Sequence, residues 1–233
     1  MKISIIVPTY NEKENIEVLI KALYKNCAKS LKEIIIVDDN SPDGTHFIVQ
    51  DLSKKFKNLR LILRKGKKGL PSAISEGIKN AKGEYVLWMD SDLSHPPPLI
   101  LEMLKFIPKY DVVCASRYVK GGKDNRPFPR ILTSRMLNTF GNIILRTGVK
   151  DMTSGFCLVR KSVFDKLELK QEGYVEYCIR FTYQSVKNGY KWKEVPYISN
   201  DRKKGSSKSY MNFFNFIKNG YLCIKEIIQL RFS

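Results

Sequence analysis

The sequence predicts an α/β fold with a mostly parallel sheet, helices on both faces of that sheet, and an amphipathic helix at the C-terminal end. Short runs of β-branched and other apolar residues alternate with segments of helical spacing through the first half, which is the pattern of a parallel α/β sheet. These runs are apolar throughout rather than alternately polar, as expected for strands covered on both faces. The length of 233 residues is enough for one sizeable core.

The first half contains five predicted strands and three predicted helices. The first strand, 3–7, ends at Pro8, and the helix after it repeats apolar residues at i, i+3 and i+4 from Ile16 to Leu23. The other segments follow the same two patterns. They predict strands at 34–37, 59–63, 85–89 and 112–115, and helices at 15–25, 45–56 and 70–81.

The composition changes after Arg117. Residues 117–147 carry seven basic side chains and one acidic side chain, Asp124, which is a local net charge of +6. The rest of the chain predicts strands at 155–159 and 190–198, a helix at 174–187, a polar loop at 200–209 and a terminal helix at 210–230. The terminal helix has a wide apolar arc, which suits packing on the core or on a second subunit. Its aromatic residues and neighbouring cations also suit a position in a bilayer surface.

The overall charge implies an anionic partner. The chain has 41 Lys and Arg against 23 Asp and Glu, a formal net charge of +18. Nucleic acid, an anionic membrane surface or a phosphorylated substrate would each complement it. A nucleic-acid-binding protein should carry a basic recognition helix or an aromatic platform, whereas these charges are spread among α/β elements. We therefore predict no nucleic-acid partner.

Cysteine usage and hydropathy indicate in which compartment the protein is located. The five cysteines are scattered and form no C-x-x-C pair, so we expect buried, reduced thiols rather than a disulfide framework or a zinc site. No segment has the roughly 18 apolar residues that a membrane span needs. The expectation is a protein that is soluble or bound at a membrane surface, and cytoplasmic by default.

Acidic residues follow three of the predicted strands. Glu12 comes after the first strand, Asp39 after the second, and Asp90 and Asp92 after 85–89. The carboxyl ends of the strands are where open α/β sheets bind ligands. Two aspartates on one turn can hold Mg²⁺ or Mn²⁺, which favour oxygen ligands and share them with substrate phosphates. His95 precedes three prolines and is expected to be a structural hydrogen-bonding residue rather than a base.

Six ordered motifs carry a resemblance to a known family. They are VPTYNEKENI (7–16), VDDNSPDGT (37–45), DSDLSHPPP (90–98), SRYVKGG (116–122), DMTSGF (151–156) and DRKKGSSK (201–208). Together they span nearly the whole chain and resemble the family-2 glycosyltransferases, which have the Rossmann-like GT-A fold. Within that family they are most similar to members that transfer mannose to a polyprenyl phosphate.

The resemblance implies a role for individual residues. It implies catalytic roles for Asp92, Arg117 and Arg202, and a metal site for Mg²⁺ or Mn²⁺ at Asp90, Asp92 and Ser94. Ser94 is the weakest of these ligands, because some relatives have a glutamine at its position. The residues implied to bind the nucleotide sugar are Pro8, Tyr10, Glu12, Val37, Asp39, Asp90, Ser91, Asp92, Arg117, Arg202 and Lys208.

The function implied is an inverting transfer of mannose from GDP-mannose to dolichyl (polyprenyl) phosphate. A phosphate acceptor has a second pKa of about 6 and needs no general base, which agrees with the lack of a strong base candidate. Two alternatives stay open. One is a UDP-glucose or UDP-N-acetylhexosamine donor with the same acceptor. The other is a polysaccharide or glycan acceptor, which needs a carboxylate base, and Glu176 is the candidate.

The division of the chain follows from these roles. We expect a catalytic domain over 1–200, with a nucleotide-sugar half at about 1–118 and an acceptor half at about 119–200. Residues 201–233 would form a basic loop and the amphipathic helix. Larger relatives carry transmembrane hairpins after this region, so we expect membrane attachment here to be peripheral, on the cytoplasmic face. A homodimer is also possible through the terminal helix.

Overall fold

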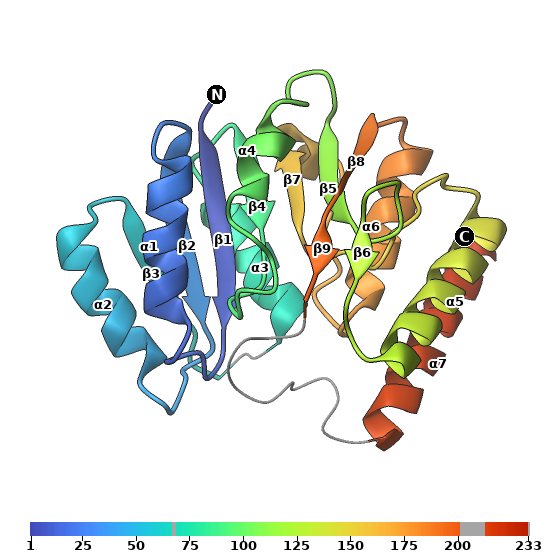
Figure 1. The fold of residues 1–233 in the computed structure, drawn as a ribbon, viewed down its shortest axis with the longest axis horizontal. Helices are drawn as coiled ribbons and strands as arrows, with labels where there is room; N and C mark the ends of the chain where they lie inside the picture. Colours follow the sequence, from blue (N-terminus) through green and yellow to red (C-terminus); the bar gives the residue numbers. More distant parts are fainter. Residues whose placement is uncertain (67–68, 201–212, 233) are drawn as a thin grey trace.

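The computed structural model describes residues 1–66, 69–200 and 213–232 (Figure 1). Its strands are β1 (Ile3–Thr9), β2 (Leu31–Asp38), β3 (Leu59–Leu63), β4 (Tyr85–Trp88), β5 (Val112–Ser116), β6 (Lys123–Asp124), β7 (Cys157–Arg160), β8 (Trp192–Pro196) and β9 (Ile198–Ser199). Its helices are α1 (Ile16–Cys27), α2 (Thr45–Lys55), α3 (Leu70–Asn80), α4 (Leu99–Leu104), α5 (Phe128–Leu145), the 3-10 helix η1 (Lys161–Asp165), α6 (Glu176–Lys187) and α7 (Phe213–Phe232).

Seven strands form one mostly parallel sheet, which confirms the predicted fold class. Their order is β3-β2-β1-β4-β7-β5-β8. β7 runs antiparallel to its neighbours β4 and β5, and the other adjacent pairs are parallel. β6 and β9 form a separate parallel pair. The predicted strand at 190–198 is therefore two strands, β8 and β9, which belong to different sheets.

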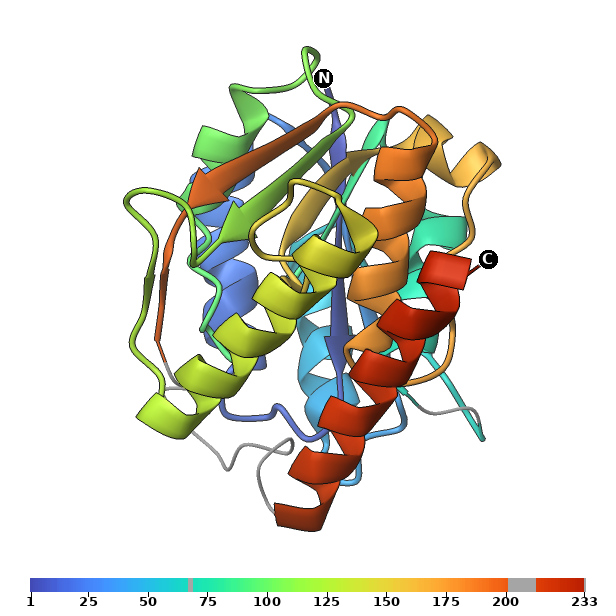
Figure 2. The same ribbon diagram turned by 90° about the vertical axis from the view of Figure 1, so that its right-hand side faces the viewer.

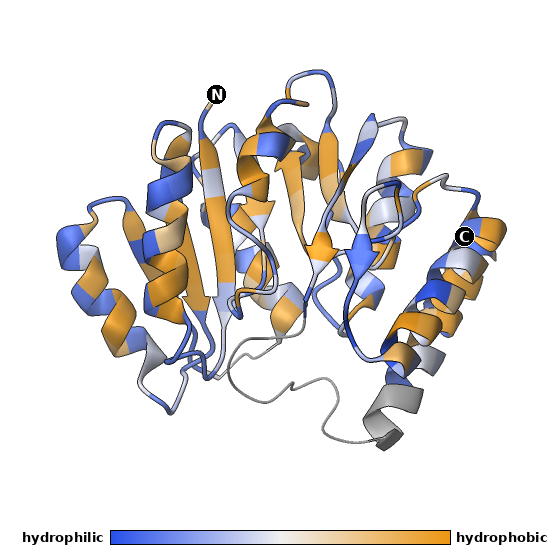
Figure 3. Ribbon diagram, viewed as in Figure 1, coloured by the Kyte–Doolittle hydropathy of each residue, from blue (hydrophilic) through white to orange (hydrophobic). Residues whose placement is uncertain are grey.

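The strands are apolar throughout because both faces of the sheet are covered. Successive residues of β1 show this, since Ile5 packs with α1, α2 and α4 on one face while Ile6 packs with α3 and α6 on the other. Hydropathy colouring shows the central strands as a continuous apolar layer between the helices (Figure 3). Within the described residues, no helix is long and apolar enough to cross a membrane.

α5 and α7 form an outer layer beside α6. They lie side by side in Figure 2, and a third apolar cluster joins them through Leu145, Ile179 and Ile227. A buried carboxylate fixes α7 in this layer. Glu226 is 2% exposed and accepts hydrogen bonds from Arg180 at 2.5 Å and Lys170 at 2.6 Å. Since a buried charge is tolerated only when it is paired, this cluster determines which side of α7 faces inward.

α5 is the main element that the sequence pattern did not predict. It occupies 18 residues of the basic stretch, where cations interrupt the apolar spacing. Pro129 lies in its first turn, a position at which a proline costs the helix no hydrogen bond. Read from the sequence, the Pro-Phe-Pro segment is more typical of a turn than of a helix start.

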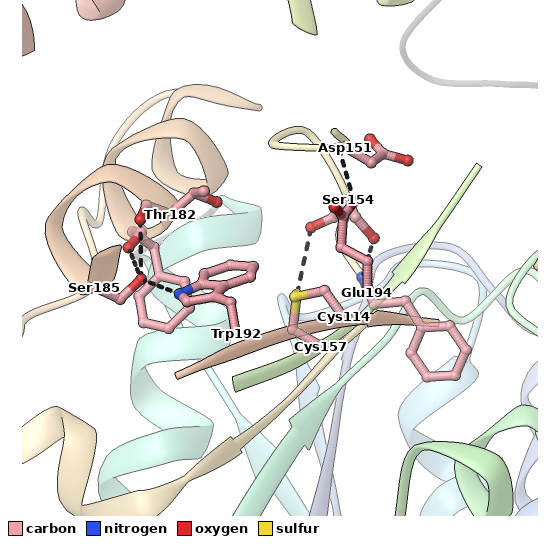
Figure 4. The surroundings of a disulfide bond; sticks show 10 residues. Cys114, Asp151, Ser154, Cys157, Thr182, Ser185, Trp192 and Glu194 are labelled. Carbon is pink, nitrogen blue, oxygen red and sulfur yellow. Dashed lines mark hydrogen bonds between the residues drawn. A yellow bond between two sulfur atoms is a disulfide. The ribbon is translucent and has the colours of Figure 1, made fainter. Parts of the chain in front are cut away.

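The expectation of reduced thiols is wrong for two of the five cysteines. Cys114 on β5 and Cys157 on β7 form a disulfide (Figure 4), and the two residues lie directly opposite each other in the antiparallel register. Cys27, Cys178 and Cys223 are buried free thiols, as predicted. A sequence separation of 43 residues gives no spacing signal, because only the strand pairing brings the two sulfur atoms together.

The disulfide should contribute measurably to stability. Replacing both cysteines (Cys114→Ala with Cys157→Ala) should lower the free energy of unfolding by about 4 kcal/mol, the chain-entropy value for a loop of this length. Urea unfolding with and without reductant measures the effect. Reductant should destabilise the wild type and the control Cys27→Ala, but not the double variant. A wild type that is indifferent to reductant would contradict the disulfide.

Candidate active site

A cavity of about 610 Å³ lies at the carboxyl ends of the central strands. Loops after β1, β2 and β4 supply one side of it, and residues from the end of β5 through α5 supply another. The first group brings carboxylates (Glu12, Asp39, Asp90 and Asp92), and the second brings guanidinium groups (Arg117, Arg126 and Arg130). The volume is in the range of small-molecule sites.

Side-chain hydrogen bonds tie the loop after β1 to the loop after β2. The Thr9 hydroxyl donates to Asp38 at 2.7 Å, and the Glu12 amide donates to the Thr45 hydroxyl at 3.0 Å. The Asn15 side chain donates to the Glu12 carboxylate at 3.0 Å. These bonds hold the loop so that Pro8, Tyr10 and Glu12 all line the cavity.

Asp39 connects β2 to the start of α3. Its carboxylate accepts hydrogen bonds from the Gly69 amide at 2.8 Å and from Arg64 Nε at 2.6 Å. Arg64 also donates to the Ser72 hydroxyl, so the first turn of α3 is held against the cavity. The side chain of Val37, by contrast, is buried in the core and does not reach the cavity. Among the described residues assigned to the nucleotide sugar, Val37 is thus the one that does not line the cavity.

The Asp90-Ser91-Asp92 segment is a constrained turn at the end of β4. The Asp90 amide donates to His95 Nδ1 at 3.0 Å, and the buried His95 ring stacks on Phe156, in agreement with a structural histidine. Ser94 donates its hydroxyl to Asp92 Oδ1 at 2.6 Å. Between these residues Leu93 has a positive φ of 64°, which is uncommon for a side chain of this kind and is held here by packing against the core.

The turn fits a divalent cation that is shared with a substrate. Asp90, Ser91, Asp92 and Ser94 all line the cavity, and the Asp90 side chain is 45% exposed. The described residues contain no group of three or more His, Cys, Asp and Glu side chains that could hold a metal by themselves. A pair of aspartates is nevertheless the protein share that Mg²⁺ typically takes when phosphate oxygens complete its shell. The Ser94 hydroxyl orients Asp92 in this structure.

Arg117 is a buried structural cation at the edge of the cavity. Its Nε and one terminal nitrogen donate to Asp151 at 2.7 and 2.6 Å, and its amide donates to Asp151 at 3.0 Å. Burial alone lowers the pKa of the guanidinium, but the charge and hydrogen bonds of Asp151 outweigh burial and raise this pKa above its ordinary value. Arg117 therefore stays charged, with most of its donors already engaged.

Arg126 and Arg130 add positive charge beside Arg117. Arg126 makes a two-point ion pair with Asp124 at 2.8 and 2.6 Å, and Arg130 begins a face of α5 that continues with Ser134 and Leu137 into the same cavity. The sequence showed these arginines only as part of a basic stretch. The spacing of 130, 134 and 137 would have placed Arg130, Ser134 and Leu137 on one face once the helix was recognised.

The remaining predicted residues are Arg202, Lys208 and Glu176. Arg202 and Lys208 lie outside the described residues. Glu176 is buried and accepts hydrogen bonds from the amides of Tyr174 and Val175 at 2.7 and 2.8 Å. These contacts are those of a residue that stabilises the start of its own helix. Glu176 does not line the cavity, so the base named for a glycan acceptor has a structural role.

Buried phenols and thiols in the cavity stay protonated at neutral pH. Burial raises the pKa of Tyr197 to about 12, and it raises the pKa of Tyr177 well above its ordinary value. Burial also raises the pKa of the Cys223 thiol to about 12. These three protonated groups supply hydrogen-bond donors and packing rather than a base or a thiolate nucleophile.

Comparison with known proteins gives consistent matches. The model of the family "Glycosyl transferase family 2" matches residues 4–168. The dolichol-phosphate mannosyltransferase of Pyrococcus furiosus is 39% identical over 234 residues, covering 97% of this chain. This chain spans 64% of that relative's length. The polyprenol monophosphomannose synthase of Mycolicibacterium smegmatis is 33% identical over 212 residues, which are 88% of this chain and 79% of the relative.

Solved structures match the fold. A glucosyl-3-phosphoglycerate synthase from Mycobacterium tuberculosis, in complex with Mn²⁺, UDP and phosphoglyceric acid, superposes with a TM-score of 0.75 at 15% identity, covering 99% of this chain and 78% of that one. The mannosyl-3-phosphoglycerate synthase from Rubrobacter xylanophilus has a TM-score of 0.73 at 16% identity, with 98% and 73% covered. These matches confirm the expected GT-A fold.

Asp151 should be a strong determinant of stability. Asp151→Asn keeps the shape of the side chain but leaves the buried Arg117 without its counter-charge, which should cost about 3–5 kcal/mol of unfolding free energy. Asp111→Asn is the control, because the Asp111–Arg160 pair is partly exposed and its loss should cost under about 1 kcal/mol. Urea unfolding of both variants checks this, and equal losses would contradict the assigned role.

Proposed function

Because the chain belongs to glycosyl transferase family 2, we propose that it transfers mannose from GDP-mannose to a dolichyl or other polyprenyl phosphate, with inversion at the anomeric carbon. The names of two relatives, a dolichol-phosphate mannosyltransferase and a polyprenol monophosphomannose synthase, support the sugar and the acceptor class. The donor half would be about 1–118 and the acceptor half about 119–200.

One observation carries this proposal, namely the separation of charge across a single cavity. Carboxylates at the ends of β1, β2 and β4 face one part of it, while Arg117, Arg126 and Arg130 line another. A nucleotide diphosphate with a divalent cation suits the first part, and a phosphorylated acceptor suits the second. Two anionic substrates can then lie side by side without strong repulsion.

The chemistry follows from these two parts. A phosphate oxygen of the acceptor forms the new bond to the anomeric carbon of the sugar, and the bond from that carbon to the donor diphosphate breaks. A divalent cation held at Asp90 and Asp92 would stabilise the charge that develops on the departing diphosphate. The acceptor is an anion at neutral pH, since its second pKa is about 6, and no side chain has to remove a proton.

The arginines would position the acceptor rather than react with it. Charge-assisted hydrogen bonds to a phosphate are worth about 1.5–3 kcal/mol each. Arg126 and Arg130 are proposed for these contacts. Arg117, whose guanidinium is largely engaged by Asp151, is proposed to keep the loop with Thr153 and Ser154 in place. Arg202 and Lys208 remain proposals from the family motif.

A transfer assay tests the proposal. Purified protein with radiolabelled GDP-mannose, Mg²⁺ and a short-chain polyprenyl phosphate should give a labelled lipid, whereas UDP-glucose and UDP-N-acetylhexosamines should not. EDTA should abolish the product. Asp92→Asn should lower kcat/KM by an amount that corresponds to several kcal/mol of lost transition-state stabilisation. Glu102→Gln, at an exposed position of α4 that does not line the cavity, is the matched control. Full activity in EDTA would contradict the metal site. A labelled lipid formed from a UDP-sugar would show that the donor is a UDP-sugar rather than GDP-mannose.

We further propose that α5 and α7 bind the cytoplasmic surface of an anionic membrane. Each helix keeps a stripe of exposed apolar side chains, from Phe128 to Ile143 on α5 and from Tyr221 to Phe232 on α7. The two helices are neighbours (Figure 2), and exposed cations such as Lys225 accompany the stripes. This is the pattern of helices that lie in a bilayer interface. A lipid acceptor would present its phosphate at the same surface.

The apolar stripes should account for membrane binding. Met136→Glu with Ile228→Glu places a charge in each stripe and should release the protein from vesicles of anionic lipid, because both side chains would otherwise be buried in the interface. The control Val18→Glu with Phe47→Glu changes two exposed apolar residues on α1 and α2 and should bind like the wild type. Co-sedimentation measures binding. A wild-type dimer that the first variant converts to a monomer would instead identify a subunit interface.

A further inference from the structure

A second, smaller cavity is lined by Tyr118, the residue that follows Arg117 in the chain. It has a volume of about 520 Å³ and runs between α5 and the loop that follows α5. Its lining includes Tyr118, Arg135, Asn138, Asn142 and Lys150. We call this cavity the α5 groove. None of its lining residues belongs to the first cavity, so the groove is a separate place for a ligand.

The charges of the groove favour an anion. Arg135 and Lys150 supply two positive charges, and no Asp or Glu is among the residues that line this part of the described chain. Two carboxylates come near the groove. Glu194 is engaged by the backbone amides of Lys150 and Asp151 at 2.9 and 3.0 Å. Asp124 accepts a hydrogen bond from the Tyr118 hydroxyl at 3.3 Å and is neutralised by its ion pair with Arg126. The Thr139 hydroxyl and the Asn142 side-chain amide, which also line the groove, can add hydrogen bonds to a phosphate group.

The rim of the groove favours a lipid over a free anion. Ile143 lines the groove and is 68% exposed. It is the last member of the α5 stripe, which also contains Met136 at 63% exposure. An ion such as inorganic phosphate would leave these side chains in water. A glycerophospholipid has its phosphate next to an apolar tail, which matches two cations beside an apolar stripe.

Two residues that line the groove, Tyr118 and Asn138, also contact residues of the first cavity, and together they form the wall between the two cavities. The ring of Tyr118 contacts two guanidinium groups, that of Arg117 at 5.0 Å from the ring centroid and that of Arg135 at 5.6 Å. Its hydroxyl donates to Ser134 at 2.8 Å, and Ser134 lines the first cavity. Asn138 also spans the wall, since its amide nitrogen donates to Thr153 at 3.0 Å. A group bound in the groove therefore contacts residues that support the site of transfer.

We propose that the α5 groove binds the phosphodiester headgroup of an anionic glycerophospholipid, separately from the acceptor. This inference rests on the membrane docking proposed above, because the tail of the lipid would follow the α5 stripe. Headgroup binding would place α5 at a fixed depth and orientation on the bilayer. Headgroup binding would also couple membrane contact to the wall between the two cavities, which contacts Arg117 and Ser134.

A soluble short-chain lipid tests the site without a bilayer. Calorimetric titration of the wild type with dihexanoyl phosphatidylglycerol, below its micelle concentration, should show binding at least about tenfold tighter than with dihexanoyl phosphatidylcholine or inorganic phosphate. Arg135→Ser with Lys150→Ser should weaken phosphatidylglycerol binding about tenfold or more, since two charge-assisted contacts are lost. The control Lys55→Ser with Lys57→Ser removes the same charge from exposed positions of α2 and its C-terminal loop and should bind like the wild type.

The outcomes separate this proposal from the others. Equal binding by the groove variant and the wild type would overturn the groove as the site, and equal affinity for inorganic phosphate would overturn the lipid as its occupant. Nucleotide binding to the first cavity, titrated with GDP and Mg²⁺, should be unchanged in the groove variant and shows that it is folded. Failure of GDP to bind the wild type would count against the transferase and not against the lipid site.

Discussion

The buried ion pair of Arg117 and Asp151 is the contact on which the site depends. It joins the end of β5 to the loop before β7, two points that are 34 residues apart in the chain. Because both charges are buried, the pair is stable only while its hydrogen bonds are complete. Asp151 is positioned in turn by Glu194 on β8, which accepts a hydrogen bond from the backbone amide of Asp151. The position of Arg117 beside the cavity thus depends on the end of β5, on β8 and on the loop before β7.

The two sides of the main cavity are held in different ways. On the acidic side, loops after adjacent parallel strands are joined by short side-chain hydrogen bonds, such as those from Thr9 to Asp38 and from Gly69 to Asp39. These loops begin at strand ends that the sheet already fixes. On the cationic side a long excursion leaves the sheet after β5 and returns at β7, and a disulfide closes its base (Figure 4).

The outer layer of α5 and α7 connects the main cavity to the exposed apolar stripes of these two helices. The inner faces of α5 and α7 are fixed by Gly141, which leaves room for Ile227, and by the buried Glu226 with its two cations. With their inner faces occupied, the helices can present their apolar stripes outward without loss of the core. In the proposals above, the large positive charge of the chain serves to bind phosphate groups. Cations beside the stripes, in the α5 groove and in the main cavity would each contact a phosphate of a lipid or a substrate.

The sequence by itself determined the alternation of strands and helices, because continuous apolar runs and helical spacing are local consequences of burial on two faces of a sheet. It also determined the acidic residues at the strand ends, since that edge follows from the parallel topology. Only the tertiary structure decided the antiparallel insertion of β7, the Cys114–Cys157 bond and the two-point pairing of Arg117 with Asp151. Each of these is a contact between distant segments, and neither periodicity nor spacing along the chain records which distant residue a side chain will meet.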